Sequence, residues 1–163
     1  MSQTTRTVLF VLAVAFVGEV GLAPLLSFRG ITPDFAVIAI VVLALSRGAF
    51  AATIGGFALG LIQDLASPQL LGLHALAQTI VGYGCGRLRG MLLYGHPAVE
   101  GTLVALASLV HQTVYLLGES GFGLGSFLRP FLLQALPGAL FTGLLGVPLL
   151  RLAARLRILD PEE

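Results

Sequence analysis

The chain of 163 residues has no tryptophan, no lysine and one cysteine. The single thiol, Cys85, excludes an internal disulfide. Without tryptophan, any aromatic belt at a membrane surface must consist of phenylalanine and tyrosine. Charged residues make up 10% of the chain, against about 25% in an ordinary soluble domain. Because so few charges cannot cover the apolar surface of a soluble fold, the composition excludes a soluble enzyme, a nucleic-acid-binding module and a disordered linker.

Apolar residues and glycine dominate instead. Hydrophobic residues make up 56% of the chain, 21 residues are glycine, and the mean hydropathy is +0.97. A helix needs about 20 mostly apolar residues to cross a bilayer. The sequence therefore predicts an all-α, polytopic membrane protein with a single transmembrane domain, residues 1–163. Its six spans are predicted at about 8–26, 34–45, 49–64, 70–86, 98–117 and 131–150, with a cytoplasmic tail at 151–163.

The first span follows Arg6, as the apolar part of a secretory signal would. No convincing small-residue cleavage site comes after it, and five more apolar segments follow, so we expect it to be retained. The next apolar block, residues 35–62, would hold Arg47 at its centre if it were one helix. A guanidinium there costs at least about 2.5–3.5 kcal/mol. We therefore predict a tight turn at residues 46–48 between two short spans, with Pro33 suited to the first turn of the earlier one.

The arginines test the number of spans. Six spans place both termini on one side, and this side then holds seven of the nine arginines. The positive-inside rule makes it the cytoplasmic side, so we expect both termini in the cytoplasm. The arginines on that side are Arg6, Arg47, Arg87, Arg89, Arg151, Arg155 and Arg157, which leaves Arg29 and Arg129 outside.

Polar side chains gather in the outer half of every predicted span. Ionisable residues within spans usually face the bundle interior or a cavity and point to function. We therefore predict a polar cavity that opens on the outer side. Its predicted members are Glu19, Asp34, Gln63, Asp64, His74, Gln78, His111, Gln112 and Gln134.

Simpler interpretations of these residues stay open. Asp34 is equally suited to capping a helix, and Asp64 to ending its helix in water at the interface. Glu19 is harder to dismiss, because it lies about 11 residues into its span, and we expect Arg29 or His111 as its partner. No tight ligand spacing, nucleophile elbow or phosphate loop is present, so we expect no metal, no cofactor and no catalytic residue.

Small residues recur at every fourth position in several spans. This spacing lets helix backbones approach closely. Packing within the chain is the favoured interpretation, and a groove that docks a partner is the alternative. The residues are Gly48, Ala52, Gly56 and Gly60 in the third span, Gly82 and Gly86 in the fourth, and Gly138 and Gly146 in the sixth.

One series of residues resembles a known family. It comprises Thr32-Pro33-Asp34, Gly56-Phe57, Gly60-Leu61-Ile62-Gln63-Asp64, Gly72, Gly82-Tyr83 and Gly86-Arg87. In a chain of this length with six predicted spans, the series resembles the rod shape-determining protein MreD family of bacteria.

The resemblance implies a non-enzymatic scaffold of the bacterial inner membrane that organises peptidoglycan synthesis in the cell-elongation machinery, the elongasome. It implies that the bitopic protein MreC is the direct protein partner and that membrane lipids also contact the chain. Indirect links to the MreB filament, the RodA glycosyltransferase and a class-B penicillin-binding transpeptidase are also implied. The expected fold is similar to that of the S-components of energy-coupling-factor transporters.

Two other functions remain as alternatives. An S-component-like subunit would bind a vitamin in the outer cavity and dock on a coupling subunit through an A-x-x-x-A pattern in the first span. Glu19 lies between Ala15 and Ala23 and interrupts that pattern, which counts against a transporter. An intramembrane enzyme would need a catalytic pair, for which Glu19 and His111 are the only plausible residues.

The topology can be tested with single cysteines in a Cys85→Ser background. Cysteines at Ser46, Gly90 and Glu162 should resist an impermeant thiol reagent in intact cells, because these positions are predicted to be cytoplasmic. A cysteine at Ser120 should react. Labelling from outside at Ser46 would overturn the predicted turn between the two short spans.

Overall fold

A computed structural model describes residues 3–28, 30–66, 70–90, 96–121 and 123–159. This part of the chain is helical apart from short connections and one isolated β-bridge, between Phe28 and Ile31, so the predicted all-α class is confirmed for it. The helices in order are α1 (Gln3–Phe16), the π-helix η1 (Val17–Leu22), α2 (Ala23–Leu26), α3 (Phe35–Ala66), α4 (Leu73–Leu88), α5 (Pro97–Glu119), α6 (Leu124–Pro130), the π-helix η3 (Phe131–Ala135) and α7 (Leu136–Arg155).

Four helical segments of the described chain are long and apolar enough to cross a membrane: Thr4–Leu26, Phe35–Ala66, Pro97–Glu119 and Leu124–Arg155. Six spans were predicted. The difference arises because α3 is counted once and because α4 has only 16 residues, about 24 Å of helix against a hydrocarbon thickness of about 30 Å.

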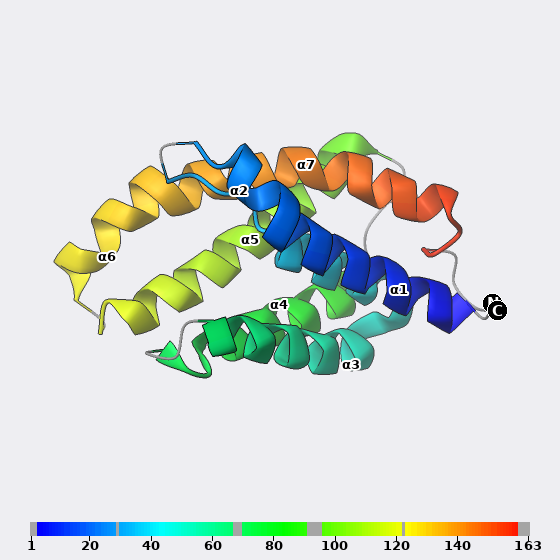
Figure 1. Cartoon of the computed structure of the whole chain (residues 1–163), viewed down its shortest axis with the longest axis horizontal. Coiled ribbons are helices and arrows are strands. Elements are labelled where there is room, and N and C mark those ends of the chain that lie inside the picture. The colour runs from blue at the N-terminus through cyan, green and yellow to red at the C-terminus, as the bar shows by residue number, and fades with distance from the viewer. Residues whose placement is uncertain (1–2, 29, 67–69, 91–95, 122, 160–163) are drawn as a thin grey trace.

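α3 consists of two arms joined at Gly48. This residue has φ 81° and ψ −176°, a combination that is open essentially to glycine alone. In Figure 1 the arm before Gly48 runs toward the end that holds both termini, and the arm after it runs back. The turn predicted at residues 46–48 is therefore present, between arms of residues 35–47 and 49–66.

Ser46 is a poor position for the labelling test. It is 7% exposed, and its hydroxyl donates to the carbonyl oxygen of Val42 over 2.8 Å. A cysteine there would be shielded from reagent on either side. Gly90 is exposed and is the informative position at this end of the bundle, while Glu162 lies outside the described residues.

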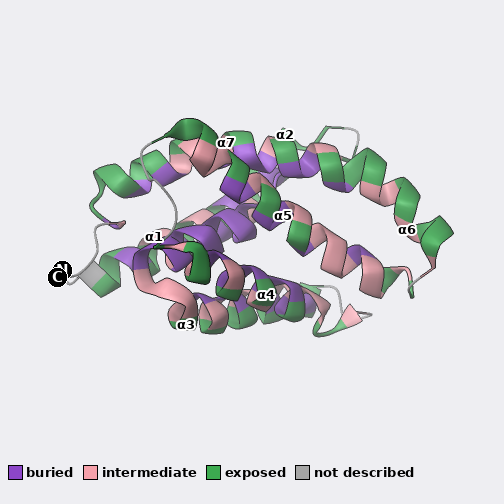
Figure 2. Cartoon of the chain, turned by 180° about the vertical axis from the view of Figure 1, so that it is seen from behind, coloured by how far each residue is buried: buried purple, intermediate pink, exposed green. Residues whose placement is uncertain are grey.

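The first arm of α3 forms the centre of the bundle. Every residue from Val37 to Val42 is 0% exposed, and α1, α5 and α7 all contact α3. In Figure 2 the buried residues concentrate on this arm and on the inward sides of its neighbours. The central arm therefore contacts protein on all sides, although its composition alone would suit contact with lipid.

Glycines bring α4 into backbone contact with the second arm of α3. A Cβ atom on any of four glycines would overlap backbone atoms of the opposite helix, so no larger residue fits without moving the helices apart. Gly56, Gly60, Gly82 and Gly86 thus lie at this interface together with Ala52, whereas Gly48 lies at the turn between the two arms of α3. The pairs are Gly56 with Gln78, Gly60 with Ala75, Gly82 with Ala52 and Gly86 with Ala49.

A second close contact joins α5 to α7. A Cβ on Gly143 would lie 2.7 Å from the carbonyl oxygen of Gly101, and one on Gly146 would lie 2.7 Å from Cγ1 of Val104. The sequence pattern included Gly146 but not Gly101 or Gly143. A Cβ atom on Gly138, by contrast, would make only an ordinary van der Waals contact, 3.5 Å from the carbonyl oxygen of Thr32.

The C-terminal third differs most from the predicted bounds. The helical segment runs over residues 124–155 instead of 131–150, because the π-helix η3 bridges the stretch between Pro130 and Pro137. The predicted tail accordingly begins inside α7. After it the chain turns back, with the N–H of Ile158 donating to the carbonyl oxygen of Ala153 over 2.9 Å.

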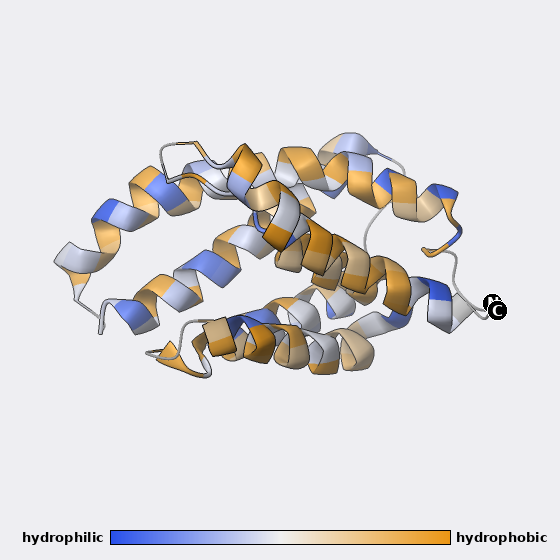
Figure 3. Cartoon of the chain, viewed as in Figure 1, coloured by the Kyte–Doolittle hydropathy of each residue, from blue (hydrophilic) through white to orange (hydrophobic). Residues whose placement is uncertain are grey.

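The outer surface of the bundle is apolar. Hydrophobic colour covers most of α1 and α7 in Figure 3. Along α6, η3 and α7, leucines at every fourth position are 42–75% exposed, a pattern typical of a face in contact with lipid chains. These residues are Leu124, Leu128, Leu132, Leu136, Leu140 and Leu144.

The packing role of the glycines predicts opposite effects for two neighbouring positions in α4. Gly82→Ala should lower the thermal stability of the detergent-purified protein, because its Cβ would overlap the backbone at Ala52. Gly84→Ala is the matched control. Nothing lies within 4 Å of its Cβ position, and alanine favours helix over glycine by about 1 kcal/mol. Equal melting temperatures for the two variants would contradict this account.

Candidate functional site

A polar cavity of about 240 Å³ lies among η1, both ends of α3, the start of α4 and the middle of α5. The connection between α3 and α4 lies at the end of the bundle opposite the two termini in Figure 1. The cavity is lined by Glu19, Thr32, Pro33, Asp34, Gln63, His74, His111, Gln112 and Tyr115.

Asp34 holds the start of α3. Its Oδ1 accepts the N–H of Val37 over 2.9 Å, which caps the helix, and its own N–H donates to the hydroxyl of Thr142 in α7 over 3.0 Å. Its Oδ2 lies 2.6 Å from Nδ1 of His111 in α5. Asp34 is therefore both a helix cap and the partner of a buried imidazole, so its two interpretations from sequence apply together.

Glu19 reaches the same helix start from η1. Its carboxylate accepts hydrogen bonds from the backbone N–H groups of Phe35 and Ala36, while its Oε2 is buried and has no hydrogen-bond partner among the described residues. Of its two expected partners, His111 lies near enough for a charge interaction. Arg29 lies outside the described residues.

Asp64 caps α4. It is 0% exposed, and its two oxygens accept the N–H groups of Gly72, His74 and Ala75, each over 3.0 Å. Nδ1 of His74 lies 3.4 Å from Oδ1 of Asp64. Asp64 does not end its helix in water, as the simpler interpretation had it, but satisfies the first turn of the next helix.

Amides and rings complete the cluster. Gln78 is 0% exposed, and its Nε2 donates to Oε1 of Gln63 over 3.3 Å. The ring of His74 lies edge-on to two others, with centroid distances of 4.3 Å to Tyr115 and 5.6 Å to His111.

Most of the residues predicted for the outer cavity come together. Glu19, Asp34, Gln63, His74, His111 and Gln112 line it, while Asp64 and Gln78 lie buried behind it. Gln134 does not line it. It is exposed on η3, because its helix begins at residue 124 and Gln134 therefore lies mid-helix rather than one turn from the start.

Three lining residues were missed by the sequence analysis: Thr32, Pro33 and Tyr115. Tyr115 follows His111 by four positions on α5, and this spacing places both on one helix face. Thr32 and Pro33 precede the first turn of α3. In this stretch the sequence pointed to a site only through Asp34, which follows them.

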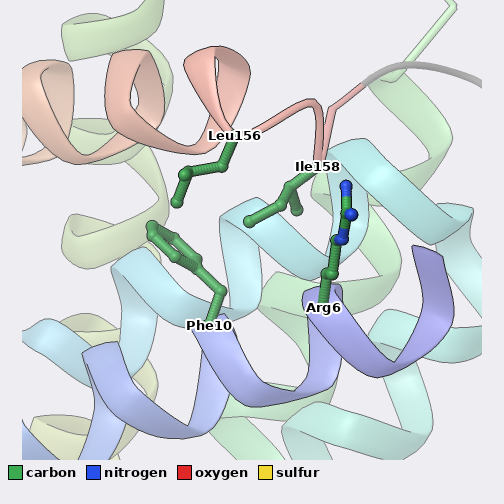
Figure 4. A pocket seen from close by; sticks show the side chains of 4 residues that line it. All are labelled: Arg6, Phe10, Leu156 and Ile158. Atoms are coloured by element: carbon green, nitrogen blue, oxygen red, sulfur yellow. The ribbon is translucent and has the colours of Figure 1, made fainter. Parts of the chain in front are cut away.

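A second cavity, of about 290 Å³, lies between the start of α1 and the turn after α7. Figure 4 shows its four lining side chains, Arg6, Phe10, Leu156 and Ile158, the last on the strand of chain that turns back. Ile158 is 2% exposed. The lining is apolar apart from Arg6, so this cavity mainly records how the C-terminal turn packs onto α1.

The chemistry available at the polar cavity is that of hydrogen-bond acceptors and imidazoles. Two carboxylates, two imidazoles and two amides line it. Among the residues that the structure describes, no three His, Cys, Asp or Glu side chains lie together as metal ligands. The arrangement suits the binding of a small polar group.

Comparison with known proteins gives one match. The sequence model of the family described as rod shape-determining protein MreD matches residues 1–154. Searches among curated proteins and among solved structures each found no match.

The cap on α4 predicts a stability effect. Asp64→Asn should lower the free energy of unfolding by about 2 kcal/mol, since one oxygen cannot accept all three N–H groups and a buried donor is left unsatisfied. Glu119→Gln, an exposed carboxylate at the end of α5, is the control and should change it by less than about 0.5 kcal/mol. Unfolding of the purified protein in detergent, followed by circular dichroism, measures both. Equal stability of the two variants would show that the cap is dispensable.

Proposed function

Since this chain belongs to the rod shape-determining protein MreD family, we propose that it is a multi-pass scaffold of the bacterial inner membrane that organises cell-wall elongation. The family is one of shape-determining membrane proteins and not a known enzyme family. The observation that carries the proposal is the extent of the match, residues 1–154, which takes in nearly all of the described helices.

The architecture supports a protein that acts by binding neighbours within the membrane. Its outer surface is apolar on several helices, and its small residues pack against each other. The cavity presents acceptors without an evident nucleophile in its lining. Such a molecule offers lipid-facing helices as lateral docking surfaces.

We place six spans in the bilayer, with both termini in the cytoplasm. In Figure 1 the start of α1, the end of α7 and the turn within α3 lie at one end of the bundle, and the arms of α3 run in opposite directions. α4 and the two arms of α3 are shorter than standard spans, and local thinning of the bilayer accommodates such lengths. The arginines near the termini then face the cytoplasm, as the positive-inside rule requires.

The proposed direct partner is MreC, through its single membrane span. The MreB filament, the RodA glycosyltransferase and a class-B penicillin-binding transpeptidase are linked through that complex to peptidoglycan synthesis. The glycines of α3 and α4 are engaged within the chain, so the partner helix must use an exposed face. The candidate faces are the second arm of α3, the outer side of α4 and the leucine face of α6 and α7.

Photo-crosslinking distinguishes these faces. A photoreactive residue at Leu61 of α3, Ile80 of α4 or Leu140 of α7 should cross-link MreC from one face and lipid from the others, because these side chains are 41%, 42% and 65% exposed. The same residue at Ala77, which is 0% exposed, is the control and should give no cross-link to another protein.

Two results would count against the proposal. MreC absent from all three cross-linked samples, in cells that express it, would exclude a direct complex through these faces. Recovery of a transporter coupling subunit with its ATPases would favour the S-component-like alternative.

A further inference from the structure

Several buried side-chain atoms around the polar cavity have no hydrogen-bond partner among the described residues. They include a pair on two lining residues, Oε2 of Glu19 and Nε2 of His111, besides Nδ1 of His74 and Oε1 of Gln78. Both residues line the cavity, and His111 is only 4% exposed. Buried polar atoms in native proteins are almost always hydrogen-bonded, so an occupant of the cavity is expected to satisfy this pair.

Oε2 of Glu19 accepts when the carboxyl group is ionised, and Nε2 of His111 accepts in the tautomer that carries its proton on Nδ1. Nδ1 of His111 lies 2.6 Å from a carboxylate oxygen of Asp34, and a carboxylate only accepts, so we assign the proton to Nδ1. In a neutral imidazole Nε2 then carries the lone pair. The free oxygen of Glu19 accepts as well. The occupant must therefore carry at least two N–H or O–H groups.

The charge around the cavity requires that donor to be cationic. Glu19 and Asp34 line the cavity, and Asp64 lies 3.4 Å from the lining residue His74. The N-termini of α3 and α4, which these carboxylates cap, supply about half a positive charge each. No described lining residue is arginine or lysine. With both imidazoles neutral, three ionised carboxylates against about one compensating charge leave the site negative.

The volume of the cavity and the chemistry of its lining further restrict the class of ligand. A volume of about 240 Å³ exceeds what a single water or a bare metal ion fills, and no metal-ligand group is present among the described residues. The rings of His74 and Tyr115, 4.3 Å apart, form one wall, and aromatic faces attract organic cations.

We propose that this cavity binds a primary ammonium group on a short carbon chain, with Glu19 and His111 as its acceptors. The group is carried either by the headgroup of an ethanolamine lipid or by a free alkylamine. This site does not depend on the proposed scaffold function. An ammonium supplies three N–H donors and one positive charge, which is what the two orphaned acceptors and the charge balance require.

Native mass spectrometry of the full chain tests the proposal. The protein is reconstituted in nanodiscs of phosphatidylglycerol that contain equal amounts of phosphatidylethanolamine and phosphatidylcholine with the same acyl chains. We expect each chain to retain one phosphatidylethanolamine molecule after its release from the nanodisc. Phosphatidylcholine should bind at least about tenfold more weakly, because its trimethylammonium group has no N–H donor. In a second arm, free ethanolammonium is added to lipid-depleted protein and thermal stability is measured.

Glu19→Gln is the decisive variant. Glutamine keeps an oxygen for the N–H groups of Phe35 and Ala36 and removes the charge, so ammonium binding should fall about tenfold or more. Glu100→Gln is the matched control. Its carboxylate lies 3.6 Å from Arg151, away from the cavity, and binding should not change. If Glu19→Gln lowers the folded yield, Tyr115→Leu at the partly exposed wall provides the same test and should also weaken binding.

Retention of phosphatidylethanolamine assigns the ammonium to a lipid, and stabilisation by ethanolammonium alone assigns it to a free amine. Both results support the site. Equal retention of phosphatidylcholine, unchanged binding in Glu19→Gln, or no binding in either arm would overturn it. Binding that appears only in Arg29→Gln would also overturn it, because the cavity would then belong to a guanidinium of the chain itself.

Discussion

The first turn of α3 lies inside the protein, and the first turn of α4 is partly buried, so the free backbone N–H groups of these helix starts have little access to bulk water. In an apolar surrounding each unsatisfied group would cost several kcal/mol. Asp34 and Asp64 satisfy these turns, and Glu19 assists at α3. Because His111 of α5 pairs with Asp34 and His74 of α4 pairs with Asp64, the residues that satisfy the helix starts also hold α5 and α4 against the two ends of α3. The polar cavity is the space left between these caps.

The caps work only if α4 lies close to the second arm of α3. Glycine contacts along that interface let the two backbones touch, so that a short aspartate side chain at residue 64 reaches three N–H groups of the next helix. With larger residues in the stripe the helices would separate, and the carboxylate would lose its reach. Packing along the apolar part of the hairpin and electrostatics at its polar end are therefore one arrangement.

Composition and spacing predicted the helical class, the turn near Arg47 and most of the cavity, whereas the family was identified by the resemblance of one series of residues. These features follow from hydropathy and from the position of each residue along a helix. Tyr115 and Gly101 were missed because they matter only through the neighbour that each one meets in space. Gln134 was misplaced because its helical segment begins at residue 124, before the apolar run from which the sixth span was predicted. Six spans were predicted, whereas four helices of the described residues are long and apolar enough to cross a membrane, because the predicted count includes the two short arms of α3 and the short helix α4.

The burial of the first arm of α3 has a consequence for how the protein is made. This arm has about 13 residues, roughly 20 Å of helix, and ends with its sides covered by protein. It is too short to cross a bilayer stably by itself, and its final neighbours α5 and α7 follow it in the chain. Insertion during synthesis therefore must deliver the two arms as one hairpin, which holds the central arm in lipid until the later helices close around it. Biogenesis would then pass through an open, lipid-filled bundle, and membrane chaperones would meet the chain at that stage.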